Sequence, residues 1–265
     1  MERRHLAECG STNTEALAHL RDGGGPLIVS ASRQTAGRGR LGRAWQSDEA
    51  ALTFSLARPF PAALDLSGLS LAVGCTVADV LDPAGERIRL KWPNDLFLDG
   101  AKLGGILIET VPLPNWNPQG WARPSPPPEG VKQTRGGPSF ACERRGVVIG
   151  IGLNLQPLPP DADRSAFASG HAALQTLDPA ATASAVLDRL APALQALLAD
   201  FETLGFAPWQ PAFERRDLAL DRPVRIGEQP GIARGVNERG ELLLETASGI
   251  APVTAGELSL RLEKV

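Results

Sequence analysis

Cysteine and histidine are both scarce in this chain. Each occurs three times among 265 residues, at Cys9, Cys75 and Cys142 and at His5, His19 and His171. The cysteines lack the paired spacing of a zinc site and the even number of a disulfide framework, and the histidines lie far apart. These absences argue against a zinc centre and against a disulfide-stapled fold, and they predict a cytoplasmic protein.

Long apolar runs and an excess of basic residues are also missing. No segment approaches the roughly 18 uninterrupted apolar residues of a membrane span, and the first residues include no apolar run of signal-peptide length. The formal net charge is −3 and the isoelectric point is about 5.7. This balance disfavours bulk attraction to nucleic acid or to an anionic membrane. We therefore expect no DNA partner and no membrane partner, and any anion site must be local.

Lysine is the rare cation of this sequence. Of 27 basic residues 23 are arginines, and the four lysines are Lys91, Lys102, Lys132 and Lys264. A lysine supplies a compact point charge where arginine supplies a planar fork. The lysines either mark positions that require such a point charge or have persisted by chance, and composition alone leaves both interpretations open.

Hydrophobic periodicity predicts an α+β fold with a mixed or antiparallel sheet. Apolar runs or alternation of strand type occur at residues 26–34, 52–56, 88–97, 103–111 and 147–155. Helical spacing of apolar residues occurs at 64–81, 182–204 and 208–216. Pro192 either kinks the second of these helices or marks its effective start.

Two domains and one insertion are predicted. Residues 1–216 form the larger domain, and residues 217–265 read as short strands with a turn at Asn237–Gly240, which is typical of a small β-barrel. Residues 112–145 contain eight prolines and four glycines, and their apolar residues follow neither the period of a helix nor that of a strand. We expect this segment to be a flexible insertion between two strands.

The stretch GRGRLG at residues 37–42 has the glycine spacing of a dinucleotide-binding turn. In that fold the third glycine opens a helix, and an acidic residue about 20 positions later binds the ribose. Here the chain continues into a predicted strand, and the acidic candidate, Asp65, is expected to begin a helix. The kinase alternative fails as well, because the remaining kinase motifs are missing. We therefore reject both interpretations.

What remains is an arginine-rich glycine loop closed by a tryptophan. Arg33, Arg38, Arg40 and Arg43 lie within eleven residues. Their mutual repulsion predicts a segment that stays mobile until an anion arrives, with Trp45 offering a flat face for a base. Arginine next to an aromatic residue is also typical of nucleic-acid binding, but one short patch on an acidic protein is weak support for it.

Six short segments carry a resemblance to a known family. They are Ser11-Thr12-Asn13, Gln34 with TAGRGRLGRAW at 35–45, KWPNDL at 91–96, KLGGILIE at 102–109, GIGLNL at 150–155 and TAGELSL at 254–260. Together they resemble the biotin protein ligases, in the family's order and over essentially the whole chain apart from the insertion. The departures are Leu41 and Ala101, where basic residues are common, and the length of the insertion.

The resemblance implies a catalytic domain similar to class II aminoacyl-tRNA synthetases and a C-terminal SH3-like barrel. Because the sequence starts directly at the catalytic domain, a form without the family's N-terminal DNA-binding domain is expected. The implied reaction joins biotin to ATP as biotinyl-5'-AMP and then transfers biotin to a lysine of the biotin carboxyl carrier domain of acetyl-CoA carboxylase. Catalysis of this kind rests mainly on positioning and charge stabilisation.

The resemblance also implies the roles of individual residues. Biotin would contact Ser11, Thr12, Asn13, Gln34, Arg38, Gly39, Arg40, Lys102 and Gly104, and ATP would contact Arg40, Arg43, Trp45, Asn94 and Asn154. Lys102, Arg38, Arg40 and Asp95 are the predicted catalytic residues, and Asp95 is placed either to hold Mg²⁺ or to orient an amine.

Each of these roles has a structural alternative. The stretch around Ser11 also fits a helix cap, the Pro93-Asn94-Asp95 sequence fits a turn, and glycine within a strand fits a bulge. Two other functions stay open: a lipoate or octanoate ligase or transferase on the same scaffold, and a non-catalytic nucleic-acid-binding module.

Overall fold

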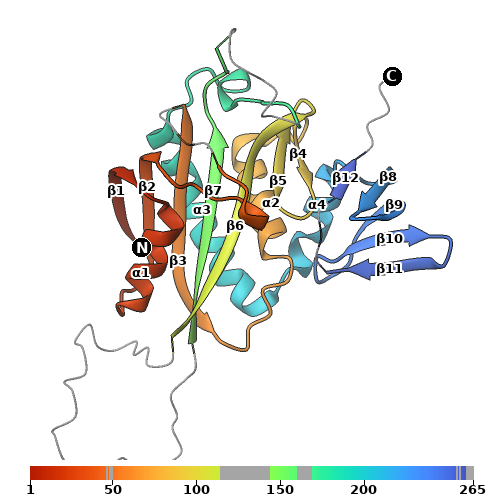
Figure 1. Ribbon diagram of the computed structural model, residues 1–265, viewed down its shortest axis with the longest axis horizontal. Helices are drawn as coiled ribbons and strands as arrows, with labels where there is room; N and C mark the ends of the chain where they lie inside the picture. Colours follow the sequence, from red (N-terminus) through yellow and green to blue (C-terminus); the bar gives the residue numbers. More distant parts are fainter. Residues whose placement is uncertain are drawn as a thin grey trace, which may run out of the picture.

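The computed structural model describes residues 1–45, 47, 50–113, 144–159, 169–254, 256 and 258–260. Most of the predicted insertion, residues 114–143, therefore lies outside the described part of the chain. The rest confirms the predicted α+β class: a large mixed sheet with helices is followed by a smaller antiparallel sheet (Figure 1). No helix in the described ranges is both long enough and apolar enough to cross a membrane.

The large sheet has seven strands in the order β1-β2-β3-β7-β6-β5-β4. Their bounds are β1 (Glu2–Cys9), β2 (Leu27–Gln34), β3 (Ala51–Pro61), β4 (Ile88–Lys91), β5 (Asp95–Leu98), β6 (Ala101–Leu113) and β7 (Arg144–Asn154). Strands β1 and β2 are parallel and every other neighbouring pair is antiparallel. Strands β6 and β7 thus occupy both ends of the segment that was predicted to be an insertion.

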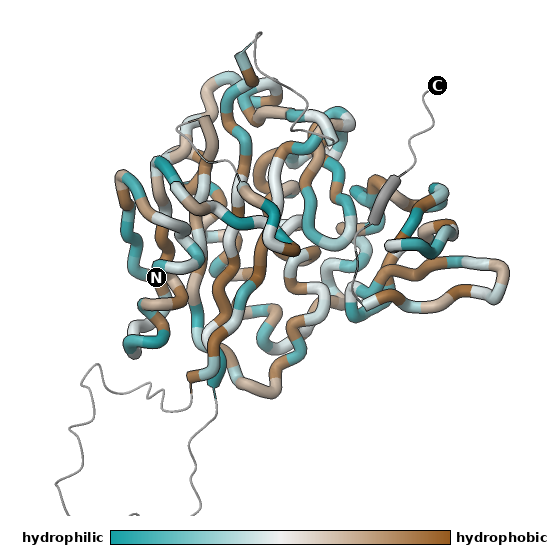
Figure 2. Tube along the Cα trace, in the orientation of Figure 1, coloured by the Kyte–Doolittle hydropathy of each residue, from teal (hydrophilic) through white to brown (hydrophobic). Residues whose placement is uncertain are grey.

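Helices cover both faces of this sheet. They are α1 (Thr12–Arg21), α2 (Leu69–Leu81), α3 (Ala183–Leu204) and α4 (Gln210–Arg216). A main hydrophobic core joins α2, α3 and α4 to one face, and a smaller core joins α1 to the other. Figure 2 shows the corresponding pattern, with hydrophobic residues interrupted at short intervals by polar ones along the central strands.

Alternation along β3 and β7 decides which residues face α1. On β3, Leu52, Phe54 and Leu56 enter the main core, so Thr53 and Ser55 point to the α1 side. On β7, Ile149, Ile151 and Leu153 enter the main core, so Gly150 and Gly152 point to the α1 side. One face of the sheet therefore offers hydroxyl groups and open space next to the start of α1.

Three local expectations were wrong. Residues 88–97 form a hairpin of β4 and β5 instead of one strand, because Trp92, cis-Pro93 and Asn94 make a turn that pairs Lys91 with Asp95. Strand β1 was not predicted, since most of its residues are exposed and charged. Asp65 does not begin a helix.

The carboxylate of Asp65 accepts a hydrogen bond from the Ser67 amide, and α2 starts later, after Gly68. Helix α3 starts at Ala183, where Thr182 caps it, so Pro192 lies inside the helix.

The smaller sheet has the order β11-β10-β9-β8-β12. Its strands are β8 (Pro223–Ile226), β9 (Gln229–Val236), β10 (Leu242–Thr246), β11 (Gly249–Val253) and β12 (Leu258–Leu260). The predicted turn at Asn237–Gly240 joins β9 to β10, and it packs on the large domain. Trp92 Nε1 donates a 3.0 Å hydrogen bond to the Gly240 carbonyl, and a side chain at Gly240 would overlap the backbone of Gly68.

A buried ion pair fixes the end of α4 to the end of α2. Arg216 and Asp82 are 4% and 5% exposed, and Arg216 Nη1 lies 3.2 Å from Asp82 Oδ2. Burial alone would raise the pKa of Asp82, but the amides of Ile88 and Arg87 and the Arg216 guanidinium together hold that pKa below its usual value. Removing one member of such a pair leaves an unpaired buried charge, which costs about 3–5 kcal/mol.

Asp217, the next residue, carries an unsatisfied carboxylate between the two sheets. Its Oδ1 accepts a hydrogen bond from the Ala219 amide, and its Oδ2 is buried without a hydrogen-bond partner among the described residues. Burial raises the pKa of Asp217 to about 6, with smaller contributions from Glu214 and Asp221. Between about pH 4 and pH 6 the Asp217 carboxyl is therefore protonated in the folded protein but ionised in the unfolded chain.

We predict that Asp217→Asn stabilises the protein relative to wild type as the pH rises through this window. The contribution of protonated Asp217 to the free energy of unfolding is complete below the pKa of the unfolded chain, near 4. It is lost as the pH rises through the pKa of the folded protein, about 6. The gain at pH 7 is at most about 3 kcal/mol, since a tenfold change in proton affinity corresponds to about 1.4 kcal/mol. Denaturant unfolding of both proteins from pH 4 to pH 8 measures it, and a difference that does not change with pH contradicts the prediction.

Candidate functional site

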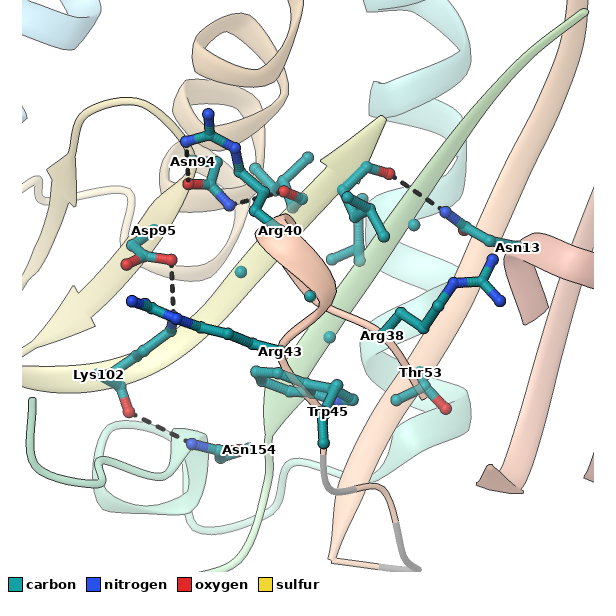
Figure 3. A pocket seen from close by; sticks show the side chains of 18 of the residues that line it. Asn13, Arg38, Arg40, Arg43, Trp45, Thr53, Asn94, Asp95, Lys102 and Asn154 are labelled. Carbon is teal, nitrogen blue, oxygen red and sulfur yellow. Dashed lines mark hydrogen bonds and ion pairs between the residues drawn. The ribbon is translucent and has the colours of Figure 1, made fainter. Parts of the chain in front are cut away.

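A cavity of about 670 Å³ lies on the α1 side of the large sheet. Its walls come from the start of α1, the arginine loop (residues 37–45), the β4–β5 hairpin and the middle of β6 and β7 (Figure 3). The predicted residues that line it are Ser11, Thr12, Asn13, Gln34, Arg38, Gly39, Arg40, Arg43, Trp45, Asn94, Asp95, Lys102 and Asn154. Segments spread over most of the chain thus meet at one place.

One predicted residue lies elsewhere. Gly104 does not line the cavity, whereas its neighbour Gly105 does. A side chain at Gly104 would overlap the carbonyl oxygen of Gly152 on β7, so this glycine permits close approach of two strands.

Sequence reasoning also missed several lining residues. Among them are Thr53, Lys91, Trp92, Gly150 and Ser169. The two-residue alternation of β3 and β7 would have indicated Thr53 and Gly150, because their neighbours are strongly apolar. No comparable signal points to Ser169, which lies in a loop.

A buried network of neutral polar groups forms one end of the cavity. Ser11, Thr12 and Asn13 are each less than 5% exposed. Gln34 Oε1 accepts hydrogen bonds from the Thr12 amide (2.7 Å) and hydroxyl (3.1 Å). The hydroxyl of Ser55 lies 2.7 Å from Thr12 Oγ1 and 2.6 Å from Asn13 Oδ1. Ser11 occupies the N-cap position of α1, but its side chain makes no capping hydrogen bond.

The arginine loop sends its guanidinium groups in different directions (Figure 3). Arg38 contacts Glu109 on β6 and Thr14 on α1. Arg40 Nη1 donates to Asn94 Oδ1 (3.4 Å) and to the Gly256 carbonyl (3.2 Å). Arg43 extends toward the end of the cavity where Asp95 and Lys102 lie. This separation reduces the repulsion from which a mobile loop was predicted, and the mobility itself stays a prediction.

Arg33, the fourth arginine of the segment, is not part of the cavity lining. It forms a salt bridge with Glu8 at 3.1 Å, between β2 and β1. The predicted arginine cluster is therefore reduced to three members at the site.

Lys102 and Asp95 form the opposite end of the cavity from the polar network. Lys102 Nζ lies 2.7 Å from Asp95 Oδ1. Asn154 Nδ2 donates to the carbonyls of Lys102 (3.3 Å) and Ala172 (3.1 Å), which fixes the backbone that carries this lysine. Asn94 has a similar supporting place, because its Nδ2 donates to the Ile106 carbonyl at 2.9 Å.

A protein-bound metal ion does not fit this arrangement. The carboxylate of Asp95 is already paired with an ammonium group, and the described residues contain no group of three histidine, cysteine or acidic side chains suited to a metal. Mg²⁺ is commonly held by one or two carboxylates together with substrate phosphates and water. Asp95 alone therefore does not form a resident metal site.

Two glycines of β7 create the space that the cavity needs. A side chain at Gly150 would overlap the amide of Asn13, and one at Gly152 would lie 2.5 Å from Trp45 Cε2. The indole of Trp45 rests on the backbone at Gly152, and its Nε1 is buried without a hydrogen-bond partner in the described structure. A buried donor that lacks a partner is costly unless a ligand supplies an acceptor.

Comparison with known proteins gives matches to both parts of the chain. Residues 10–117 match the Biotin/lipoate A/B protein ligase family, and residues 220–261 match the Biotin protein ligase C terminal domain. The "Biotin--[acetyl-CoA-carboxylase] ligase" of Paracoccus denitrificans is 32% identical over 267 residues, covering 96% of this chain and 98% of that protein. These matches confirm the family resemblance found in the sequence.

Two further relatives extend the comparison. The "Bifunctional ligase/repressor BirA" of Escherichia coli is 34% identical over 249 residues, and the match spans 87% of this chain and 65% of that longer protein. The structure of the biotin protein ligase from Aquifex aeolicus in complex with biotin and ATP superposes with a TM-score of 0.72 at 26% identity, covering 98% of each chain.

We predict that Gly152→Ala displaces the indole of Trp45. The added methyl group would meet the rigid ring system well inside normal contact distance. The fluorescence of Trp45 is obtained as the difference between each protein and its Trp45→Phe counterpart. Its emission should shift to longer wavelength as the ring enters water. Gly105→Ala is the control, because a methyl group there meets nothing closer than 3.5 Å. An unchanged difference spectrum for Gly152→Ala would refute the prediction.

Proposed function

The chain belongs to the biotin protein ligase family, and we propose that it is an ATP-dependent biotin–acetyl-CoA-carboxylase ligase. In the proposed reaction the biotin carboxylate attacks the α-phosphate of ATP and releases pyrophosphate. The resulting biotinyl-5'-AMP then passes its acyl group to a lysine of a biotin carboxyl carrier domain. The observation that carries the proposal is one cavity with a buried neutral network at one end and a lysine with arginines at the other.

The neutral end suits the ureido ring of biotin. Burying such a ring without hydrogen bonds costs about 1–3 kcal/mol for each unpaired group. Ser11, Thr12, Asn13 and Gln34 provide uncharged donors and acceptors that are held in place by their own network. In this proposal these residues bind the ring, with Ser55 as their support.

The cationic end suits two anions that must come together. The carboxylate of biotin and the α-phosphate of ATP repel each other until positive charge compensates them. Lys102 supplies this charge at its end of the cavity, and Arg38 and Arg40 supply it from the arginine loop, with Gly39 allowing the loop backbone to approach. Arg43 is assigned to the phosphates that leave. Trp45 offers its face to the adenine ring.

Supporting residues keep this charge in position. Asp95 orients the ammonium group of Lys102, and Asn94 and Asn154 hold Arg40 and the Lys102 backbone. Direct contacts of these two asparagines with the nucleotide stay predictions. Mg²⁺ is proposed to arrive with the phosphates of ATP, and no step of the reaction is assigned to it.

The proposed partner in the second step is the carrier domain of acetyl-CoA carboxylase. Its lysine reaches an acyl-adenylate that water would otherwise hydrolyse, so closure of the arginine loop over this intermediate is part of the proposal. A cytoplasmic location, and the lack of DNA and membrane partners, continue as predictions from composition.

Biotin-dependent release of pyrophosphate from ATP tests the proposed activity. We expect release with biotin, further turnover when a carrier domain is added, and little inhibition by lipoate. Release driven by lipoate or octanoate instead would favour the alternative ligase on the same scaffold. Salt-sensitive binding of RNA or DNA without pyrophosphate release would favour the nucleic-acid-binding alternative.

We predict that Arg40→Gly still forms the adenylate but loses it to solution. Arg40 connects the loop to Asn94 and to Gly256 in the connection from β11 to β12, so its removal loosens closure while Lys102 stays in place. Biotin should then label lysines of bystander proteins, as detected on a blot with a carrier-free mixture. Arg33→Gly, outside the cavity, is the matched control. Labelling confined to the carrier domain would rule out this role of Arg40.

A further inference from the structure

Glu109 contacts both the polar network and the arginine loop although it was assigned no role. It lies on β6 two residues beyond the cavity-lining Leu107, so both side chains are on the same face of the strand. Asn13 Nδ2 donates a 2.8 Å hydrogen bond to Glu109 Oε2. Arg38 donates to both carboxylate oxygens, at 3.2 and 3.3 Å. One carboxylate thus joins the ring-binding end to the arginine loop.

Two acceptors decide how the Asn13 amide is turned, the Glu109 carboxylate at 2.8 Å and, more weakly, the Leu107 carbonyl at 3.4 Å. An asparagine amide has two orientations of nearly the same shape, which exchange a donor for an acceptor. A carboxylate only accepts hydrogen bonds, so the nitrogen of Asn13 must face Glu109. The opposite orientation would place two oxygens 2.8 Å apart. The oxygen of Asn13 therefore lies over Gly150, where the sheet leaves space.

This orientation leaves an acceptor available to a ligand. Asn13 Oδ1 lies 2.6 Å from the Ser55 hydroxyl, which occupies one of its two lone-pair directions. The second direction remains for a group in the cavity, which Asn13 and Gly150 both line. A ligand that is to satisfy it must present an N–H or O–H donor.

We infer that Glu109 is a positioning residue that makes the ring-binding end selective for N–H donors. By fixing the Asn13 amide, it presents an acceptor to the ureido N–H of biotin, and the dithiolane ring of lipoate has no donor to match it. The same carboxylate holds Arg38, so the orientation of the ring site and the position of the loop depend on one group. This inference rests on the proposed function and adds a cause for its choice of substrate.

A role in stability alone does not account for Glu109. The side chains of Arg38 and Glu109 are 42% and 29% exposed. Ion pairs with this much contact with water contribute little to folding. The contact that distinguishes Glu109 from a surface residue is the one with Asn13, which is 4% exposed.

Two substitutions separate the acceptor character of Glu109 from its shape. Glu109→Gln keeps the shape but introduces a donor, so only the longer contact with the Leu107 carbonyl then opposes turning of the Asn13 amide. Glu109→Asp keeps an acceptor-only group on a shorter side chain. We expect the Kd for biotin, measured by calorimetry without ATP, to rise about tenfold or more for Gln and less for Asp. In pyrophosphate release the KM for biotin should rise by a larger factor than kcat falls, and more for Gln than for Asp, because the main effect of Glu109 is on the ring-binding end while Arg38 also depends on it.

The matched control is Glu8→Gln, which removes the carboxylate of another glutamate–arginine pair, with Arg33, away from the cavity. It should leave the Kd for biotin unchanged. Affinity in the order wild type, Asp, Gln supports the inference. If the Gln variant binds biotin as tightly as wild type, or more tightly than the Asp variant, the inference is overturned, because the shape of the side chain alone would then suffice.

Thermal unfolding shows whether each variant is folded. If the Gln variant does not fold, the Asp variant decides, and a Kd within about tenfold of wild type supports the inference while a larger loss overturns it. Failure of the proposed function is a separate result: in that case the wild-type protein itself does not bind biotin. Normal wild-type binding with an unaffected Gln variant removes only the role of Glu109.

Discussion

The site depends on the absence of side chains along one side of a single buried strand. Strand β7 sends Ile149, Ile151 and Leu153 into the main core, and between them Gly150 and Gly152 leave the opposite face bare. Asn13 and Trp45 occupy the space so created. The strand therefore stabilises the fold and shapes the cavity at once, because the two-residue period of a strand keeps these tasks on separate faces. Larger side chains on the bare face would fill the cavity with protein.

Charge in the cavity is held apart by contacts with distant parts of the chain. Each positive group has a fixed neighbour, as in Arg38 with Glu109, Arg40 with Asn94, and Lys102 with Asp95. Cations packed this closely repel one another, and contacts of this kind keep them at a distance without neutralising the whole site. The pairs also mean that entering anions exchange partners with the protein, so less solvent reorganisation is required than around bare charges.

Much of the fold was predictable, because long apolar periods survive in β2, β3, β6, β7, α2 and α3. Strand β1 was not, since an edge strand with exposed glutamate and arginine has no apolar face to detect. The hairpin around Pro93 was read as one strand because its two halves are only four residues long. At the site, most of the motif residues line one cavity, and their roles stay predictions. Glu109 and Ser55 were missed because their importance comes from neighbours across the sheet, which sequence spacing does not reveal.

The bond between Arg40 and the Gly256 carbonyl joins residues 216 positions apart. During synthesis the arginine loop emerges early from the ribosome, while Gly256, which precedes the last strand of the smaller sheet, is made near the end. The nascent chain therefore lacks this contact for most of its time in translation, even when the large sheet has already formed. The cavity is therefore fully assembled only late, after the second sheet has formed and packed against the first.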